Sequence, residues 1–347
     1  MTEPDPRLGQ TSRVSSDIAV LVNLRARRGS QAVATACRRT LPGARVLASR
    51  SLDEAVDFAH GLGNSPPSLL ISAGGDGTAV TLINALRGQP AAASPIGCLR
   101  LGTGNAWART TGSPAWRSAI ERLGVLQHSS AALPLRRFEL VEVDGTLAPF
   151  AGTGWDAELI DDFHAQKSGL GLLPASARNG LGGYLHGLFT RTIPRHVLSS
   201  EQVEVELTNT GADAITIDEH GQPVPVPGGG HGAVLYRGPV NVCAAGTSAE
   251  WGFGFRAFPF AGSVPRRFCM RVYGGSVLEA TWRMRSLWRG VHPMPKMHTW
   301  MLTRCKAVFS RPVPFQIGGD RVGKKTEVEY TLAAEEVSLL DWRQLAA

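Results

Sequence analysis

Short apolar runs alternate with longer amphipathic segments along about the first 135 residues of the chain. The apolar runs are rich in leucine and β-branched side chains and are predicted as strands; they are Ile18–Val22, Ala44–Ala48, Leu69–Ala73 and Pro95–Leu101. The segments between them are predicted as helices, the second with Ser51 as its N-cap; they are Gln31–Arg39, Leu52–Gly61 and Ala79–Leu86. This alternation predicts a doubly wound parallel sheet with helices on both faces.

The pattern changes after about Leu135, where apolar and polar residues alternate one by one. Phe138–Val143, Val203–Leu207 and Ala214–Ile217 have this period of two, which is typical of half-exposed antiparallel strands. A helical insertion is predicted near residues 176–192. The second part of the chain is therefore expected to be mostly β.

Length and composition favour two folded domains. The chain has 347 residues, of which 43% are hydrophobic and 19% charged, enough to bury two cores. It contains no apolar stretch of 18 residues, and Met1–Ser16 lacks an apolar signal core, so we expect a cytoplasmic protein. The five cysteines are widely spaced and form no CxxC pair, which predicts reduced, buried thiols and no zinc site.

The chain is basic, with a net charge of +7 and a pI near 9.5. The arginines gather in two regions, which are residues 25–39 and 283–289. A basic surface suits nucleotide phosphates, anionic lipid surfaces or nucleic acid. Arginines that are simply solvated explain the same composition equally well.

The segment Gly74-Gly75-Asp76-Gly77-Thr78 lies between a predicted strand and a predicted helix. Its three glycines let the backbone approach a bulky anion, and the helix start offers unpaired N–H groups to phosphate. The segment is neither a Walker A loop nor a dinucleotide fingerprint, because its spacing fits neither pattern. The carboxylate of Asp76 would repel a phosphate unless it binds a metal, takes a proton or holds a hydroxyl group.

A second small-residue loop, Gly102-Thr103-Gly104-Asn105, follows the next apolar strand. Asn23 ends the first strand, at the edge where open α/β sheets bind ligands. Loops at neighbouring strand ends can form one site, in which Thr103 and Asn105 would supply hydroxyl and amide contacts. Each feature alone is also explained by an ordinary turn.

Together these motifs resemble the catalytic domain shared by diacylglycerol kinases, sphingosine and ceramide kinases, and bacterial soluble lipid kinases. The residues that match are Asn23, Gly74 to Thr78 and Gly102 to Asn105, and Ser49 stands where the family usually has a nucleotide-contacting threonine. The resemblance implies a nucleotide site made of Asn23, Ser49, Gly74, Gly75, Asp76, Gly77, Thr78, Gly102, Thr103, Gly104 and Asn105. Leu24 departs from the proline that usually follows the asparagine.

The resemblance also implies an organisation into two domains. Residues 1–137 would form an NAD-kinase-like α/β nucleotide domain, to which residues 326–347 return. Residues 138–325 would form a β-sandwich that binds the lipid, with the active site in the cleft between the domains. Gly152–Glu158 is similar to the segment that opens the family's β-rich domain, which implies that Asp156 or Glu158 contacts the lipid headgroup.

The segment Gly318-Gly319-Asp320 overlays the family's Asp-Gly-Glu, whose aspartate is the general base in bacterial diacylglycerol kinases. Without a gap, Gly318 stands at the aspartate and Asp320 at the glutamate. If the register is shifted, Asp320 takes the role of the family's aspartate. The alternative interpretation is that the protein has lost catalytic activity. In sphingosine kinases the glycine-loop aspartate, here Asp76, is the favoured base.

The function implied by the resemblance is ATP-dependent phosphorylation of a lipid hydroxyl, on diacylglycerol or a sphingoid lipid. ATP and Mg²⁺ would be the cofactors, with Asp76 and Asp320 as the acids for metal contact or base duty. An NAD-kinase-like enzyme and a catalytically silent lipid- or nucleotide-binding protein are the rivals. The expected partners are a lipid substrate and an anionic membrane surface, without nucleic acid; a homodimer is compatible with the sequence.

Two aromatic segments admit both a membrane and a core interpretation. Trp282–Arg289 mixes aromatic, apolar and basic residues as interfacial segments do, although packing in the core explains it too. Trp251–Phe260 would line an acyl pocket or form a core strand and loop of the β domain.

Overall fold

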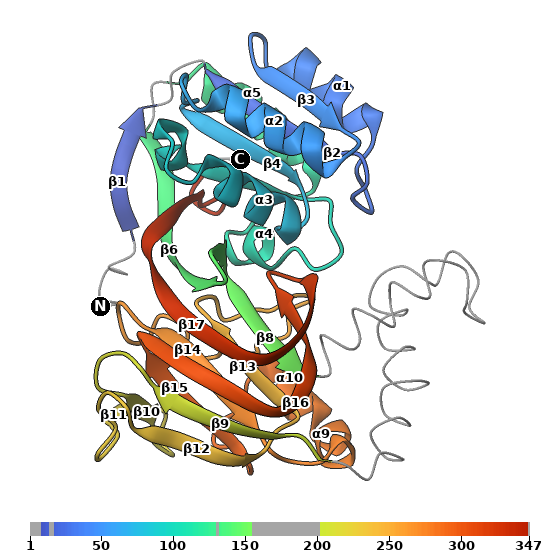
Figure 1. Ribbon diagram of the computed structural model, residues 1–347. Coiled ribbons are helices and arrows are strands. Elements are labelled where there is room, and N and C mark those ends of the chain that lie inside the picture. The colour runs from blue at the N-terminus through green and yellow to red at the C-terminus, as the bar shows by residue number, and fades with distance from the viewer. Residues whose placement is uncertain (1–7, 14–16, 130–131, 155–201, 346–347) are drawn as a thin grey trace, which may run out of the picture. The chain divides into compact units, whose positions relative to one another are not determined.

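A computed structural model describes residues 8–13, 17–129, 132–154 and 202–345 (Figure 1). The chain divides into two compact units, residues 1–138 with 335–347, and residues 139–334. Residues 335–347 of the predicted returning segment belong to the first unit, and residues 326–334 belong to the second. The predicted helix near residues 176–192 and the predicted headgroup contacts Asp156 and Glu158 lie outside the described residues.

The first unit is an α/β structure that also receives the end of the last strand, β17 (Asp320–Leu340). Its elements in chain order are β1 (Leu8–Arg13), β2 (Ile18–Asn23), α1 (Gln31–Thr40), β3 (Arg45–Ser49), α2 (Leu52–Leu62), β4 (Leu69–Gly74), α3 (Asp76–Leu86), the 3-10 helix η1 (Pro90–Ala93), β5 (Ile96–Arg100), α4 (Ala106–Thr110), α5 (Trp116–Gln127) and β6 (Ala132–Val143). Strands β3, β2, β4 and β5 pair in parallel in that order, which confirms the predicted parallel sheet.

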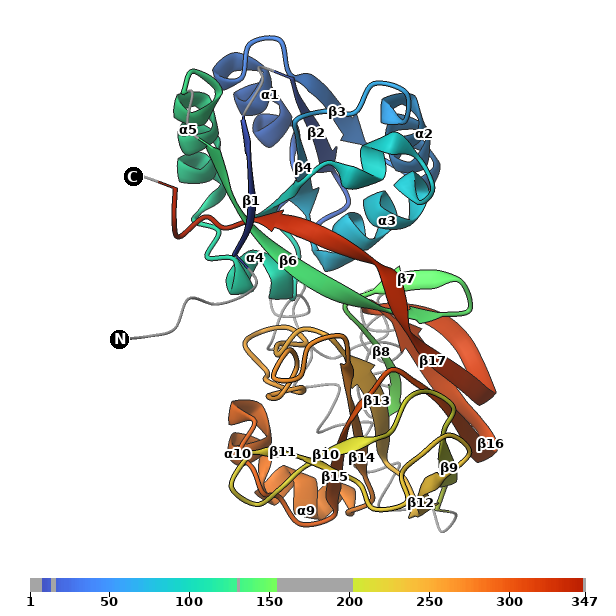
Figure 2. The ribbon, with the colours of Figure 1, turned by 90° about the vertical axis from the view of Figure 1, so that its left-hand side faces the viewer.

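Helices cover both faces of this sheet, as the alternation of strands and helices predicted. Figure 2 shows α1 and α5 on one side and α2 and α3 on the other. The five residues before Asn23 in β2 are fully buried, as expected for a central strand covered on both faces. Leu340 and Trp342, from the end of the chain, are buried in the same core.

The register of the sheet aligns the strand ends that carry the predicted site. Asn23 of β2 pairs with Ser49 of β3, and Gly74 of β4 pairs with Arg100 of β5. The chain goes from β2 to β3 on one side and later returns to β4 on the other side of β2. The strand order therefore reverses between β2 and β4, and open α/β sheets bind ligands outside the carboxyl ends of their strands at such a reversal.

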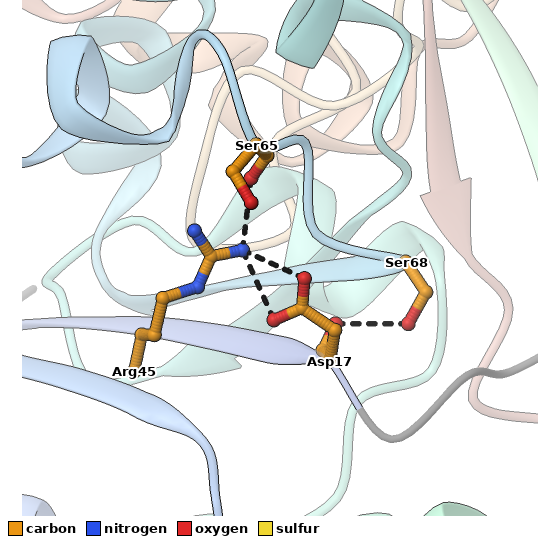
Figure 3. Close-up of polar contacts among 4 residues, drawn as sticks. All are labelled: Asp17, Arg45, Ser65 and Ser68. Atoms are coloured by element: carbon orange, nitrogen blue, oxygen red, sulfur yellow. Dashed lines mark hydrogen bonds and ion pairs between the residues drawn. The ribbon is translucent and has the colours of Figure 1, made fainter.

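At the opposite end of the sheet, a cluster of polar side chains joins the amino ends of three parallel strands (Figure 3). Nη2 of Arg45 donates to both carboxylate oxygens of Asp17, at 2.9 and 3.0 Å, and to the carbonyl oxygen of Ser65 at 3.0 Å. The hydroxyl of Ser68 donates to the carbonyl oxygen of Asp17 at 2.9 Å. These residues connect the starts of β2, β3 and β4, so this edge is stabilised by side chains while the other edge carries the glycine loops.

The second unit is built mainly of antiparallel strands, as the alternating pattern predicted. Its elements in chain order are β7 (Thr146–Ala148), β8 (Phe150–Gly154), β9 (Glu204–Asn209), β10 (Ile215–Ile217), β11 (Pro223–Pro225), β12 (Val234–Pro239), β13 (Val242–Gly246), β14 (Phe268–Tyr273), α9 (Val277–Trp282), α10 (Met284–Arg289), β15 (Met297–Leu302), β16 (Arg304–Ile317) and most of β17. Strands β8, β13, β14, β15, β10 and β11 pair antiparallel in that order, and β16 pairs with β8, β9 and β17.

The aromatic segment Trp251–Phe260 forms turns over the core of this unit rather than a strand. Phe258 is buried, and the ring of Trp251 lies 5.5 Å from that of Phe150 and 5.4 Å from that of Phe258, measured between centroids. All five cysteines are free and buried, which confirms the predicted burial of these thiols. No helix in the described ranges is long and apolar enough to cross a bilayer.

Candidate functional site

The two glycine loops of the first unit lie against each other. Gly75 follows β4 and Gly102 follows β5, and a Cβ built on Gly102 would lie only 2.3 Å from Cα of Gly75. The amide of Leu101 donates to the carbonyl oxygen of Gly74 at 3.1 Å. Because no side chain separates the two backbones, both loops contribute to one surface at the carboxyl edge of the sheet.

Asn23 joins the first strand to the glycine loop. Its Nδ2 donates to Oγ1 of Thr78 at 3.0 Å, and its Oδ1 accepts the amide of Arg25 at 2.9 Å. Thr78 is buried and packs over Gly74, where a Cβ would lie 2.2 Å from Oγ1 of Thr78. Close packing against Thr78 therefore requires glycine at position 74. The hydrogen bonds of the Asn23 and Thr78 side chains described above join residues of the protein to each other.

Helix α3 begins at Asp76, three residues before the predicted start at Ala79, with Gly75 in extended backbone as its N-cap. Because of this earlier start, Asp76 lies in the first turn of the helix, where a carboxylate is favoured by the helix dipole. The amide of Thr78 is hydrogen-bonded to the carbonyl oxygen of Gly75 at 3.1 Å.

The carboxylate of Asp76 caps α4, the next α-helix of the chain. Its Oδ2 accepts the amide of Ala106 at 2.9 Å and its Oδ1 accepts the amide of Trp107 at 3.1 Å. These are the first amides of α4, which have no partner within their own helix. Burial raises the pKa of Asp76, and the hydrogen bonds from Ala106 and Trp107 lower it in part. The acid in the glycine loop is therefore held by backbone donors, as a phosphate would be.

Asn105 fixes the shape of the second loop. Its Oδ1 accepts the amide of Gly102 at 2.8 Å, and its Nδ2 donates to the carbonyl oxygen of Gly102 at 2.8 Å. Its backbone is left-handed, with φ of 54°, a conformation that asparagine tolerates better than most residues. Thr103 and Gly104, between these two residues, are half-buried.

Replacing Asn105 tests this account. Asn105→Gly loses both side-chain hydrogen bonds and should lower the free energy of unfolding by about 2 kcal/mol. Asn105→Ala loses the same bonds and also forces a Cβ into the left-handed region, which adds about 1 kcal/mol. Urea denaturation measures both values, and an alanine variant more stable than the glycine variant would contradict the role of the backbone.

Three arginines missing from the predicted site lie beside it. Arg25, Arg27 and Arg28 are exposed in the turn after β2, and the amide of Arg28 donates to the carbonyl oxygen of Leu101 at 2.9 Å. Gly29 closes this turn, since a Cβ there would lie 1.9 Å from the carbonyl oxygen of Asn23. The run of arginines directly after Asn23 was the sequence signal that could have added them to the site.

Ser49 is buried at the end of β3, and its hydroxyl donates to the carbonyl oxygen of Ser51 at 2.6 Å. Its contact with a nucleotide remains a prediction. The structure thus brings together Asn23, the Gly74–Thr78 loop and the Gly102–Asn105 loop, while Asp320 belongs to the second unit.

Gly318 and Gly319 form the tight turn of the β16–β17 hairpin, in which Ile317 pairs with Asp320. Their φ values of 61° and 92° fit a type I′ turn, which favours Asn-Gly, Asp-Gly and Gly-Gly. Gly318 therefore preserves the turn that an Asp-Gly pair would make and lacks only the carboxylate. Asp320, at the first position of β17, is exposed.

The described residues contain no group of three His, Cys, Asp or Glu side chains that could hold a metal. The carboxylate of Asp76 accepts the amides of Ala106 and Trp107, and backbone hydrogen bonds from Asn105 and from Asp76 itself also lower its pKa. Mg²⁺ in phosphate-binding sites is held by one or two carboxylates, by phosphate oxygens and by water. Asp76 is the carboxylate within the two glycine loops, and it would be one protein ligand of a magnesium ion of that kind.

Comparisons with known proteins concern the family of residues 17–133 and the fold of the chain. Residues 17–133 match the model of the diacylglycerol kinase catalytic domain, while no curated protein matches the sequence of the chain. The fold is similar to that of a "putative diacylglycerol kinase" from Bacillus anthracis str. Sterne, at 15% identity over 97% of this chain and 100% of that one, with a TM-score of 0.63. A crystal structure of a diacylglycerol kinase from the same organism matches over the same shares, at 13% identity and a TM-score of 0.60.

The matched region contains β2, β4 and β5 and therefore both glycine loops and their mutual contacts. Residues 17–133, about a third of the chain, thus resemble the diacylglycerol kinase catalytic domain family.

Proposed function

We propose that this protein is an ATP-dependent lipid kinase that transfers the γ-phosphate of ATP to a hydroxyl group of diacylglycerol or a sphingoid lipid. The observation that carries the proposal is the contact between the two glycine loops at the strand-order reversal of the sheet. A surface of half-buried glycine loops bordered by exposed arginines suits a polyphosphate, because backbone amides and cations stabilise its charge.

In this proposal the first unit binds the nucleotide. The half-buried backbone of Thr103 and Gly104 and the exposed side chains of Arg25, Arg27 and Arg28 contact its phosphates. The bonds of Asn23 to Thr78 and of Asp76 to α4 keep the loops in position. Positioning matters because phosphoryl transfer depends mainly on alignment and on stabilisation of charge. Asp76 would hold Mg²⁺, which would supply neutralisation of the phosphate charge.

The transfer forms a bond between the lipid hydroxyl oxygen and the γ-phosphorus and breaks the bond from that phosphorus to the β–γ bridging oxygen. ADP leaves, and the proton of the hydroxyl passes to a carboxylate. We propose Asp320 for this step, because Asp76 is assigned to the magnesium ion and to the cap of α4. Asp320 is exposed at the start of β17, two residues after the position of the family's aspartate.

Incubation of the protein with γ-labelled ATP, Mg²⁺, a panel of lipid extracts and NAD tests the proposal. Label in an organic-soluble product supports the lipid kinase, and label in NADP would instead identify an NAD kinase. Binding of ATP without any transfer would favour the catalytically silent protein, for which Gly318 at the aspartate position is the specific observation.

Replacing Asp320 tests whether its carboxylate acts as the general base or whether the residue only follows the turn between β16 and β17. Asp320→Asn should lower kcat by about 10²–10⁴ while ATP affinity stays the same, because general-base catalysis has this magnitude. Gly318→Asp in that variant should recover part of the activity, since Asp-Gly also favours a type I′ turn. Steady-state kinetics on lipid in detergent measures both. An Asp320→Asn enzyme with normal kcat would leave Asp76 as the base.

A further inference from the structure

The surface of helices α9 and α10 in the second unit exposes large apolar side chains. Trp282 is 90% exposed and Leu278 is 59% exposed, and both belong to α9. They are four residues apart and therefore lie on one face of the helix. Ala280, on the other face, is buried with Tyr273, Leu287 and Met294. Helix α9 thus faces the core with an alanine and the solvent with a tryptophan and a leucine.

Helix α10 continues this surface with positive charge. Arg285 and Arg289 are exposed and also four residues apart, while Leu287 between them is buried. Trp288 packs inward, with its ring centroid 5.4 Å from that of Phe255. The two helices follow each other directly and lie side by side in the ribbon (Figure 2).

The charge of the surface favours an anionic partner. Residues 276–296 contain four basic side chains, which are Arg283, Arg285, Arg289 and Lys296, and one acidic side chain, Glu279. Glu279 is paired with Lys296 at 2.9 Å and lies 3.8 Å from Arg283, so Arg285 and Arg289 carry the positive charge of the outer surface.

Exposed tryptophan and leucine beside arginines form the pattern of segments that lie in a membrane interface. Tryptophan suits the headgroup region because its ring is apolar and its N–H needs a polar partner. A bilayer with anionic headgroups would cover the apolar face of α9 and attract the arginines of α10 at the same time. A protein partner or a second copy of the chain would need a complementary acidic surface.

We propose that the α9–α10 surface docks the protein on an anionic lipid bilayer, with Leu278 and Trp282 inserted and Arg285 and Arg289 at the headgroups. The inference rests on the proposed lipid kinase function, which requires a substrate held in a membrane. It adds the surface by which the protein reaches that substrate.

Sedimentation of the full chain with vesicles tests the docking. Wild type should bind vesicles that contain phosphatidylserine more tightly than vesicles of phosphatidylcholine alone, and added salt should weaken this binding. The variant R285Q/R289Q should lose about 30-fold in affinity, since each basic residue near an anionic surface contributes about fivefold. L278S/W282S should lose at least about tenfold, because burial of the two apolar side chains is removed.

Two matched variants in the first unit serve as controls. Val125 of α5 is 74% exposed and Arg39 of α1 is exposed, so V125S and R39Q change the same kinds of side chain on other surfaces. Both should bind vesicles as the wild type does. Normal vesicle binding by the docking variants would overturn the proposal. A wild-type dimer that dissociates into monomers in L278S/W282S would also overturn it, because the surface would then be a dimer interface.

A short-chain, monomeric diacylglycerol separates this inference from the proposed function. The docking variants should phosphorylate it at the wild-type rate and lose turnover only on vesicles. If wild type transfers phosphate to no lipid, the proposed function fails, and vesicle binding still decides whether the surface docks.

Discussion

Replacing Asp76 by asparagine should abolish phosphoryl transfer while the protein stays folded. Asparagine keeps the size of the side chain but carries no charge, so it loses the magnesium contact proposed here. It also turns an NH₂ group towards the amide of Ala106 or Trp107, where the carboxylate has an acceptor oxygen. We expect a loss of at least about 10³ in kcat/KM, because charge stabilisation is the main contribution to this chemistry.

The stability of Asp76→Asn should change little, because two effects oppose each other. One amide at the start of α4 loses its acceptor, which costs about 1–2 kcal/mol. Removing a buried charge gains free energy, as the raised pKa of Asp76 indicates. Because this pKa is higher in the folded than in the unfolded chain, wild type gains stability relative to the variant as pH falls towards the unfolded value. It loses this gain again as pH rises through the folded pKa, and urea titrations across the acidic range measure the difference.

Asp17→Asn provides the matched control, because it is the same substitution at the other edge of the same sheet. Asp17 is paired with Arg45, and both side chains are about one-third exposed or more. Such pairs contribute about 0–1 kcal/mol, so we expect a small loss of stability and normal phosphoryl transfer. Near-normal turnover by Asp76→Asn, or equal losses in both variants, would contradict the catalytic assignment of Asp76.

The local sequence was sufficient to predict β2 to β5 and the strand ends at which the candidate site lies. β-branched runs and helix caps are short-range signals, so β2, β4 and α2 were expected within one or two residues of their bounds. The end of α3 was predicted correctly, but its start was placed three residues too late because Gly77 disfavours a helix locally. The carboxylate of Asp76 stabilises the start of α3 through the helix dipole. The low helix propensity of the neighbouring glycines outweighed this contribution in the prediction from sequence.

The contacts that define the site could not be predicted, since they join residues far apart in the chain. Asp76 caps a helix that begins thirty residues later, and Asn23 meets Thr78 only because β2 lies beside β4. The sequence also did not show which tryptophan of the Trp282–Arg289 segment is exposed. The break between α9 and α10 at Arg283 turns Trp282 outwards and Trp288 inwards.

Replacing Gly102 by alanine should strongly damage the first unit. The new Cβ would lie 2.3 Å from Cα and 3.0 Å from the amide nitrogen of Gly75. Backbone atoms cannot rotate away as a flexible side chain can, so one of the two loops must move. Overpacking of this kind costs about 3 kcal/mol, and a shift of about 1 Å at a catalytic site lowers activity about 100-fold.

Gly75→Ala is the control, because it adds the same methyl group to the other side of the same contact. Its Cβ would lie 3.1 Å from Cα of Gly102 and 3.9 Å from the nitrogen, which a shift of a few tenths of an ångström relieves. Its backbone, with φ of −105°, is open to alanine. We expect a loss of stability of about 1 kcal/mol or less and a smaller loss of activity than in Gly102→Ala.

The two variants decide whether contact between the loops, rather than the flexibility of glycine, explains the motif. Loss of flexibility alone would act on both positions alike, since both lose backbone freedom in the unfolded chain when alanine is introduced. A steric cause acts on Gly102 far more than on Gly75, because only the Gly102 methyl group meets backbone within 3 Å. Urea denaturation and ATP affinity measured on both proteins give the answer, and equal effects would contradict a site built on the close approach of the two loops.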